Sequence, residues 1–329
     1  PRSYFLGQIT YPCAFILAKE AAGTKQILNE QQMVGTGPFK IEKIVPDQEV
    51  DLAANSAYYL GAPKVARIER PVIKDSVTRM NKYRQGELDI LSVDRGALQS
   101  VKSDAKLSKE LVSRAQPSVY YIGVNQHLYA PFQNLKVRQA FAMAINKDRI
   151  ANDLLGGLPV AHGLIAHEVP GYRKDLRGIP YDPQQAKTLL AEAGFGAGRG
   201  LPTLEINYME KGPDARAVVQ AVQESLKSNL NWPVTLKAID PSTFFDRRNA
   251  GKLSCWYLTW GADYPDPQNF TTFLLRSDSS MDFESYKNGK FDEIGKLADS
   301  TVDQRRRLEL YQQAEDVLVG DVARVPLYF

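Results

Sequence analysis

TWGADYPDP, residues Thr259 to Pro267, is the stretch that says most about the fold and function of this 329-residue sequence. It overlaps the end of a short apolar run, Cys255–Trp260, which predicts a buried strand. A carboxylate, Asp263, follows in a Gly- and Pro-rich loop beside aromatic residues and a second acid, Asp266. Such an acid suits capture of an ammonium group, since charge pairing orients the cation and an aromatic face adds roughly 0.5–2 kcal/mol. An aspartate that only forms the turn is an equally good interpretation of these residues alone.

The composition is that of a globular protein of about two domains. Hydrophobic residues make up 43% and charged residues 24% of the chain, and the net charge is +3. The sequence has no long basic run, which disfavours a nucleic-acid partner, and arginines 305–307 are best explained as a solvated helical face. It also lacks an apolar stretch of about 18 residues, so no transmembrane helix is predicted. The two cysteines, Cys13 and Cys255, neither decide the compartment nor predict a disulfide.

The first third of the chain predicts a hairpin followed by short helices. Residues 39–45 and 49–53 alternate between apolar and polar side chains on either side of a Pro-Asp-Gln turn. Asp75 is placed to cap a helix that ends near Gly86, and residues 88–91 predict a short strand.

The rest of the chain predicts long helices and then a regular alternation of strands and helices. That alternation implies parallel strands joined by right-handed crossovers, and therefore an α/β fold. The expected strands are 119–124, 204–209, 234–239, 253–260 and 325–329, and the expected helices are 134–155, 183–193, 214–227, 242–249, 288–298 and 303–319.

The alternation has a consequence for function, because ligands of open α/β sheets bind beyond the carboxyl ends of the strands. Asp263 lies just past one such end. Arg216 lies past another, where we expect it in the first turn of the next helix and suited to a carboxylate. An acid and an arginine on neighbouring strand ends could grip the two ends of a zwitterion. A solvated Arg216 paired with Asp214 or Glu210 is the alternative.

Several segments together make the chain resemble a known family. These segments are VGTGPFKI (34–41), YYLG (58–61), YRQGELDI (83–90), VNQHLYAPFQNLKVRQAFAMAINKDRI (124–150), DPQQAKTLLAEAGF (182–195), FFDRRNAGKL (244–253) and WGADYPDP (260–267). They make the chain similar to the extracytoplasmic solute-binding proteins of ABC transporters, specifically the peptide/nickel-binding family 5 that includes oligopeptide- and dipeptide-binding proteins.

The resemblance implies periplasmic-binding-protein-like (type II) lobes with largely parallel, mixed sheets. Residues 1–118 would be the middle part of lobe one, incomplete, and residues 119–329 nearly all of the second lobe. Members of the family are longer, so we expect a fragment that lacks an N-terminal region and the extreme C-terminus. The family binds its ligand between the lobes.

The resemblance also assigns roles to individual residues. Asp263 matches the aspartate that pairs with a peptide α-amine, and the backbone of 258–262, which includes Thr259, Gly261 and Ala262, matches the segment that hydrogen-bonds an extended peptide. Arg216 matches an arginine that dipeptide binders use for the α-carboxylate. The other implied positions are Arg248, a basic site near side chains or the C-terminus of longer peptides, Trp260, which lines a side-chain pocket, and Tyr257, where some oligopeptide binders have arginine.

The implied function is reversible capture of short peptides and their delivery to a membrane permease, without chemistry and without a cofactor. We expect a monomer on the periplasmic or extracytoplasmic side of a bacterial membrane, associated with it only through the transporter or a lipid anchor absent from this chain. A nickel chelate, glutathione, an opine or a sugar-type solute is the alternative ligand. A hydrolase using Asp263 and Asp266 is a distant alternative. His162 and His167 lack further ligand partners, so no metal site is expected.

Overall fold

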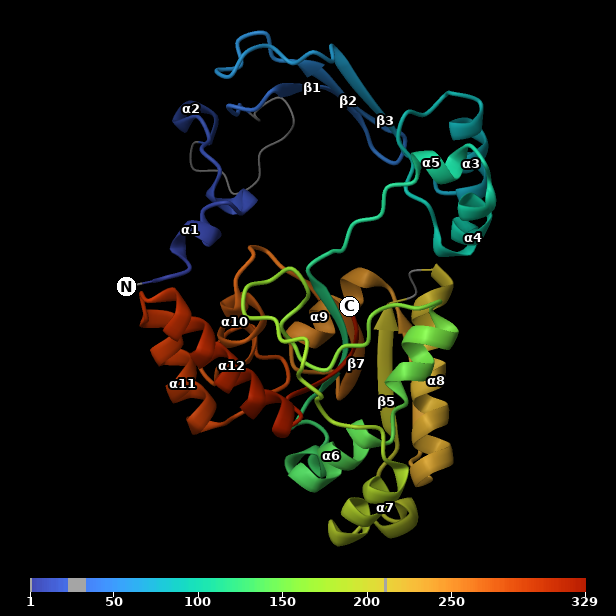
Figure 1. The fold of residues 1–329 in the computed structure, drawn as a ribbon, viewed down its shortest axis with the longest axis vertical. Coiled ribbons are helices and arrows are strands. Elements are labelled where there is room, and N and C mark those ends of the chain that lie inside the picture. Colours follow the sequence, from blue (N-terminus) through green and yellow to red (C-terminus); the bar gives the residue numbers. More distant parts are fainter. Residues whose placement is uncertain (1, 23–33, 210–211) are drawn as a thin grey trace. The chain divides into compact units, whose positions relative to one another are not determined.

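A computed structural model describes residues 2–22, 34–209 and 212–329 of the protein (Figure 1). The chain divides into two compact units. The larger unit comprises Pro1–Tyr11 and Ala115–Phe329, and the smaller comprises Pro12–Arg114. The chain therefore leaves the larger unit once and returns to it once. No helix in the described ranges is both long and apolar enough to cross a membrane.

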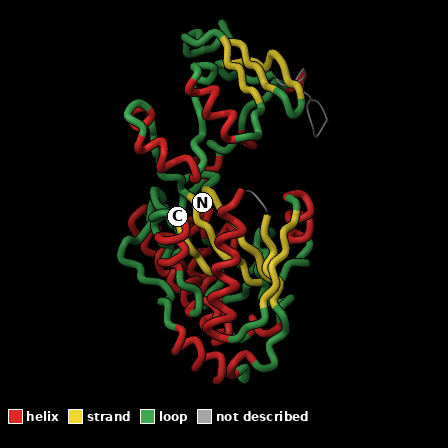
Figure 2. Tube along the Cα trace, turned by 90° about the vertical axis from the view of Figure 1, so that its right-hand side faces the viewer, coloured by secondary structure: helices red, strands yellow, loops and turns green. Residues whose placement is uncertain are grey.

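The larger unit is built on a mixed five-stranded sheet with the order β6-β5-β7-β4-β8. Figure 2 shows its strands in yellow among the helices. β5 runs parallel to both β6 and β7, as the alternation predicted, whereas β4 is antiparallel to both β7 and β8. The predicted strands are confirmed to within two residues at each end. Their bounds are β4 Ser118–Val124, β5 Leu204–Met209, β6 Val234–Ile239, β7 Cys255–Gly261 and β8 Arg324–Tyr328.

Strand β7 lies inside the sheet and is buried on both faces along its first half. Cys255 and Tyr257 belong to the main core cluster, whereas Trp256 and Leu258 pack on the opposite face with Phe244. This two-sided burial explains the continuous apolar run in the sequence.

The helices of the unit are α1 Phe5–Gln8, α6 Leu135–Met143, α7 Pro183–Glu192, α8 Gly212–Leu230, α9 Pro241–Asn249, α10 Thr272–Leu275, α11 Gly289–Ser300 and α12 Gln304–Gly320, with shorter turns η3 Ala130–Gln133, η4 Arg149–Leu154, η5 Gly196–Gly198 and η6 Pro267–Phe270.

The prediction of one long helix over residues 134–155 is wrong. Helix α6 ends at Met143, and the chain starts a second, π-helical segment, η4. The Asn146 side chain accepts a hydrogen bond from the backbone N–H of Arg149 at 2.9 Å, so it provides a new helix start inside the apolar periodicity.

The smaller unit contains a three-stranded antiparallel sheet and short helices. The predicted hairpin is confirmed, and Asp75 caps α3 by accepting from the backbone N–H of Thr78 at 2.7 Å. The predicted strand over 88–91 is wrong, because no strand lies beside this segment in the described sheet and Ile90 is 89% exposed. The elements are η1 Pro12–Ala14, α2 Lys19–Ala22, β1 Phe39–Val45, β2 Glu49–Ala54, β3 Arg67–Pro71, α3 Ser76–Arg84, α4 Arg95–Ser103 and α5 Leu107–Glu110.

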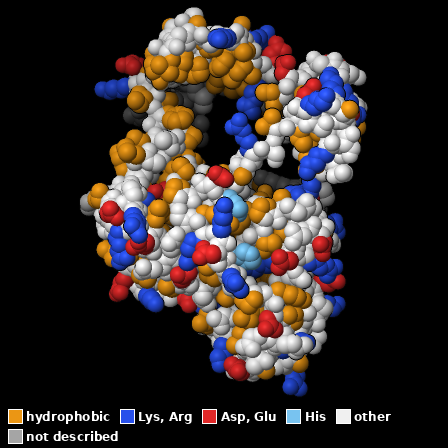
Figure 3. Space-filling model, in the orientation of Figure 1, with side chains coloured by type: hydrophobic (Ala, Val, Ile, Leu, Met, Phe, Trp, Pro, Cys, Tyr) orange, Lys and Arg blue, Asp and Glu red, His pale blue; other side chains and the backbone are white. Residues whose placement is uncertain are grey.

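Apolar side chains gather on the surface of the smaller unit, where the space-filling view shows a hydrophobic area over its sheet (Figure 3). Ile44, Val65 and Val72 are among the large apolar side chains exposed in this unit, and Val101 and Leu107 are its buried ones in the described part. The organised core of the protein therefore lies in the larger unit.

Candidate functional site

The candidate site begins at the edge of the sheet where the parallel strands end. Because β5 and β7 run parallel, Met209 and Gly261 end at the same edge. Strand β4 pairs with β7 along its whole length, but the pairing of β5 with β7 is confined to Ile206 with Cys255 and Asn207 with Trp256. Within the described sheet, residues 257–261 therefore have a neighbouring strand on one side and an open backbone edge on the other.

Asp263 follows this open edge and lies two residues beyond Gly261. Its carboxylate is half-buried and accepts a hydrogen bond from the Nδ2 of Asn269 at 3.3 Å. Its backbone N–H donates to the Oδ1 of the same Asn269 at 3.0 Å. In the described parts of the chain, no lysine or arginine pairs with Asp263. The loop thus places an aspartate that pairs with no described lysine or arginine beside a strand whose edge is open in the described sheet.

Asp266, the second acid of the loop, is occupied. Its side chain caps η6 by accepting from the backbone N–H of Gln268 at 2.9 Å. It also forms an ion pair with Arg307, whose side chain is 2% exposed, at 2.6 Å. The two acids therefore differ in role, and Asp266 holds the loop in place rather than facing a ligand.

Trp260 is fixed by the same amide that contacts Asp263. Its side chain is half-buried, its indole N–H donates to Asn269 Oδ1 at 3.1 Å, and its ring lies 6.0 Å from that of Phe273. Sequence reasoning missed Asn269. The available signal was weak, since Asn269 lies in a mixed segment, QNFTTFLL (268–275), that does not mark its amide as buried.

The remaining predicted positions on β7 divide between exposed and buried. Thr259 and Gly261 are exposed, and the N–H of Ala262 donates to the carbonyl of Pro117 at 2.8 Å, which fixes the start of the loop. Tyr257 is buried instead, and its hydroxyl is hydrogen-bonded to that of Tyr328. Burial, and then the neighbouring Tyr328, raise the pKa of Tyr257, so this phenol stays neutral.

Arg216 is exposed and lies on α8, which starts at this sheet edge. The expectation that it occupies the first turn is wrong, since the helix begins at Gly212 and Arg216 is its fifth residue. The free backbone N–H groups of the helix start therefore precede it in the sequence. Glu210, proposed above as an ion-pair partner, lies outside the described residues.

Arg248 is buried in an aromatic setting on α9. Its guanidinium carbon lies 4.0 Å from the ring centre of Phe283 and 5.0 Å from that of Phe245. The guanidinium donates to Asn249 Oδ1 at 3.1 and 3.3 Å, and burial lowers its pKa. The structure describes no carboxylate paired with it. Arg248 thus lies on α9 rather than in the Asp263 loop. Its side chain is buried, whereas that of Arg216 is exposed.

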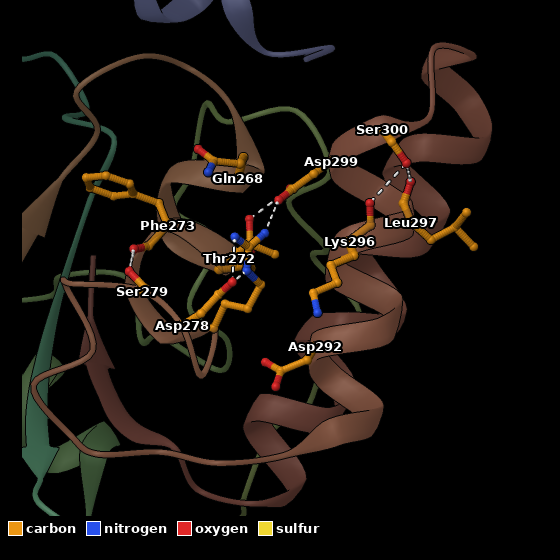
Figure 4. A network of polar contacts seen from close by, with 12 residues as sticks. Gln268, Thr272, Phe273, Asp278, Ser279, Asp292, Lys296, Leu297, Asp299 and Ser300 are labelled. Atoms are coloured by element: carbon orange, nitrogen blue, oxygen red, sulfur yellow. Dashed lines mark hydrogen bonds and ion pairs between the residues drawn. The ribbon is translucent and has the colours of Figure 1, made fainter. Parts of the chain in front are cut away.

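A network of polar contacts stabilises the segment that follows the loop (Figure 4). The carboxylate of Asp299 accepts from Thr272 Oγ1 at 2.8 Å and from the Tyr311 hydroxyl at 2.6 Å, and it pairs with Arg276 at 3.0 Å. The N-terminal segment joins the same region, because Ser3 Oγ donates to the carbonyl of Asp299 at 3.1 Å. The side chain of Asp299 therefore links helices α10, α11 and α12 to one another.

The described residues contain no group of three potential metal-ligating side chains in metal-binding proximity. His167 packs against Tyr172 and Phe329, and its ring centre lies 4.2 and 4.8 Å from the centres of their rings. The described cysteines are both free thiols, with Cys13 exposed and Cys255 buried.

Solved structures share this architecture. A periplasmic oligopeptide-binding protein of an oligopeptide ABC transporter, OppAIV of Borrelia burgdorferi, matches 100% of this chain and 66% of its own, with a TM-score of 0.84 and 26% sequence identity. The fold is accordingly that of the periplasmic-binding-protein-like α/β class.

Sequence comparison defines the family. The periplasmic oligopeptide-binding protein OppA of Salmonella typhimurium is 30% identical over 345 residues, which cover 100% of this chain and 62% of the relative. The dipeptide-binding protein DppE of Bacillus subtilis is 26% identical over 344 residues, covering 100% and 61%. The model of the middle region of the bacterial extracellular solute-binding proteins, family 5, matches residues 1–282. The chain belongs to this family, and it spans about three fifths of the length of these curated relatives.

Proposed function

We propose that this chain captures short peptides reversibly at the open edge of β7, as part of the solute receptor of an ABC importer. The observation that carries the proposal is the half-buried carboxylate of Asp263, which has no cation partner in the described chain and directly follows a strand with an open edge. A peptide offers both complements, an α-ammonium group and an extended backbone.

The strand edge supplies affinity that does not depend on the side chains of the peptide. Backbone groups of residues 257–261 would pair with the ligand as an added strand, and Trp260 would line a side-chain pocket. Arg216, exposed at the same sheet edge, is the proposed partner of the ligand carboxylate in short peptides. Arg248 would serve longer ligands, and its burial implies that a ligand reaches it only after Phe245 or Phe283 moves aside.

The partners and the lobe assignment are further parts of this proposal. The relatives named for oligopeptides and dipeptides support a peptide ligand, and the family supports an extracytoplasmic site of action and delivery to a membrane permease. Residues 1–118 and 119–329 would be parts of lobes one and two, and the receptor would act as a monomer. We propose no catalysis. A hydrolase would need two available acids, and the ion pair of Asp266 with Arg307 engages one of them.

The test is native mass spectrometry of the purified chain after incubation with a pool of di- to pentapeptides. Asp263→Asn is the informative variant, because it removes the charge and keeps the shape. Asp175→Asn, a charge removal at an exposed loop residue, is its matched control. Peptide adducts on the wild type and the control that disappear in Asp263→Asn would support the proposal. Adducts that survive in Asp263→Asn would reject it.

A further inference from the structure

One buried amide connects the strand end, the loop backbone and the free acid. Asn269 is fully buried in η6, and its Oδ1 accepts from the indole N–H of Trp260 at 3.1 Å and from the backbone N–H of Asp263 at 3.0 Å. Its Nδ2 donates to the Oδ2 of Asp263 at 3.3 Å. Three hydrogen bonds on one side chain therefore set the position of both site residues.

The chemistry of these partners requires an amide in this orientation. Two N–H donors face one atom of Asn269, so that atom must be an oxygen, and the other then has to be the NH₂ group. A carboxylate here would repel Asp263, and a hydroxyl has a single oxygen for contacts that the amide makes through two separate atoms. The amide assignment thus follows from the hydrogen-bond partners.

The amide itself is held by the second acid of the loop. The backbone N–H of Asn269 donates to the carbonyl of Asp266 at 3.1 Å, and the Asp266 side chain caps the same turn while pairing with Arg307. Pro267 at the first position restricts the turn further. Asn269 is therefore positioned by the core and is not free to follow a ligand.

Asp263 is left with two unequal oxygens. Oδ2 already accepts a hydrogen bond from Asn269 and keeps one lone pair, whereas no described residue donates to Oδ1. A primary ammonium group can bind through one oxygen, because it is a compact charge with donors in several directions. A guanidinium binds best through two parallel hydrogen bonds to both oxygens of a carboxylate. Because Oδ2 already accepts from Asn269, it is the weaker acceptor of the two, which favours a cation that binds through Oδ1 alone.

We propose that Asn269 is a positioning residue that leaves Oδ1 as the stronger free acceptor of Asp263 and thereby makes the site selective for primary ammonium over guanidinium groups. This inference rests on the proposed function, since it concerns the same carboxylate. Because Asn269 also holds the Trp260 indole, loss of the amide would change the surroundings of that ring. Trp232 and Trp256, the other tryptophans of the sequence, are 0% and 1% exposed.

The first experiment needs only the wild-type chain. A tripeptide with a free α-amine and the same tripeptide carrying an N-terminal guanidino group are titrated calorimetrically. We expect the ammonium form to bind about tenfold more tightly, which corresponds to one hydrogen bond of ordinary strength. Equal or tighter binding of the guanidino form would overturn the inference while leaving the proposed function standing. Binding of neither form would reject the proposed function and the inference with it.

Two variants test Asn269 directly. Asn269→Ser removes the contact with Oδ2, so we expect the ratio of the two affinities to fall toward one and the Trp260 emission to shift. Asn269→Asp keeps the acceptors but sets a second carboxylate beside the first. The pair then shares a proton, so the low-pH limit of peptide binding moves to higher pH. A variant that stays folded by circular dichroism and keeps both the wild-type ratio and the wild-type pH profile would contradict a positioning role.

Discussion

The guanidinium of Arg307 and the carboxylate of Asp266 lie 2.6 Å apart, and the arginine side chain is 2% exposed. This pair fixes the loop that carries Asp263 to helix α12, although the two residues are far apart in the sequence. The position of Asp263 therefore depends on Asp266, three residues later, whose own carboxylate is engaged by Arg307.

Removing the ligand-facing charge should reduce binding more than stability. Asp263→Ala is expected to weaken peptide binding by about 2–5 kcal/mol, because the ligand ammonium would lose a charged partner. The free energy of unfolding should fall by about 1 kcal/mol, since the buried Nδ2 of Asn269 loses the carboxylate to which it donates. Isothermal titration calorimetry and urea unfolding measure the two effects. Unchanged affinity would reject the role of Asp263.

Removing the loop-fixing charge should lower stability strongly. Asp266→Ala leaves the buried Arg307 without its carboxylate, which is expected to cost about 3–5 kcal/mol of unfolding free energy. The exposed pair of Arg306 with Glu309 on the same helix is the control, and Glu309→Ala should cost less than about 1 kcal/mol. Equal losses in urea unfolding for the two variants would show that the ion pair is not important for stability.

Asp282 makes stability depend on pH. Burial, and then the neighbouring Glu284, raise the pKa of Asp282 to about 7. Its pKa in the unfolded chain is about 4, so the folded protein holds the proton more tightly. The contribution is favourable below about pH 4 and is lost as pH rises through about 7.

Asp282→Asn should remove this dependence, because the amide resembles the protonated acid. Between pH 4.5 and 7.5, the wild type should lose about 1–2 kcal/mol more unfolding free energy than the variant. Urea unfolding at both pH values provides the double difference, which cancels the contribution of other carboxylates. The same slope in both proteins would contradict this assignment.

The hydrogen bond between the hydroxyl groups of Tyr257 and Tyr328 can be tested through its effect on stability. Tyr257→Phe should destabilise the protein by about 1–3 kcal/mol, because it leaves the buried Tyr328 hydroxyl without this partner. Changing both tyrosines to phenylalanine should cost less than twice the single change. Strict additivity in thermal or urea unfolding would mean that the two hydroxyls do not interact energetically.

Local patterns were sufficient for the parallel part of the fold. Strands β5, β6 and β7 alternate with helices at short spacing, and that spacing restricts the connections to right-handed crossovers. The position of β4 between β7 and β8 was not predictable in this way, because its neighbours come from distant parts of the sequence. Helix α6 was predicted too long because the spacing of apolar residues carries no information about a side chain such as Asn146, which starts a new helix.

The sequence could predict the location of a site residue only where that residue follows the end of a predicted strand. Asp263 follows a core strand, and its location at the sheet edge could be read from that. Asn269 could not be identified, since its role depends on the loop folding back toward Trp260. The burial of Arg248 was equally hidden, because a basic residue in a polar helix is usually solvated and only the rings of Phe245 and Phe283 change this.

The open edge of β7 also bears on how the protein avoids aggregation. Unpaired strand edges invite copies of the same chain to add strands and polymerise. Here the open run is short, residues 257–261, and it is followed by the charge of Asp263 and by Pro265, which has no N–H to offer. An incoming strand from another molecule would meet both before it could extend. The open edge is thus long enough to pair with a short peptide and too short to template a fibril.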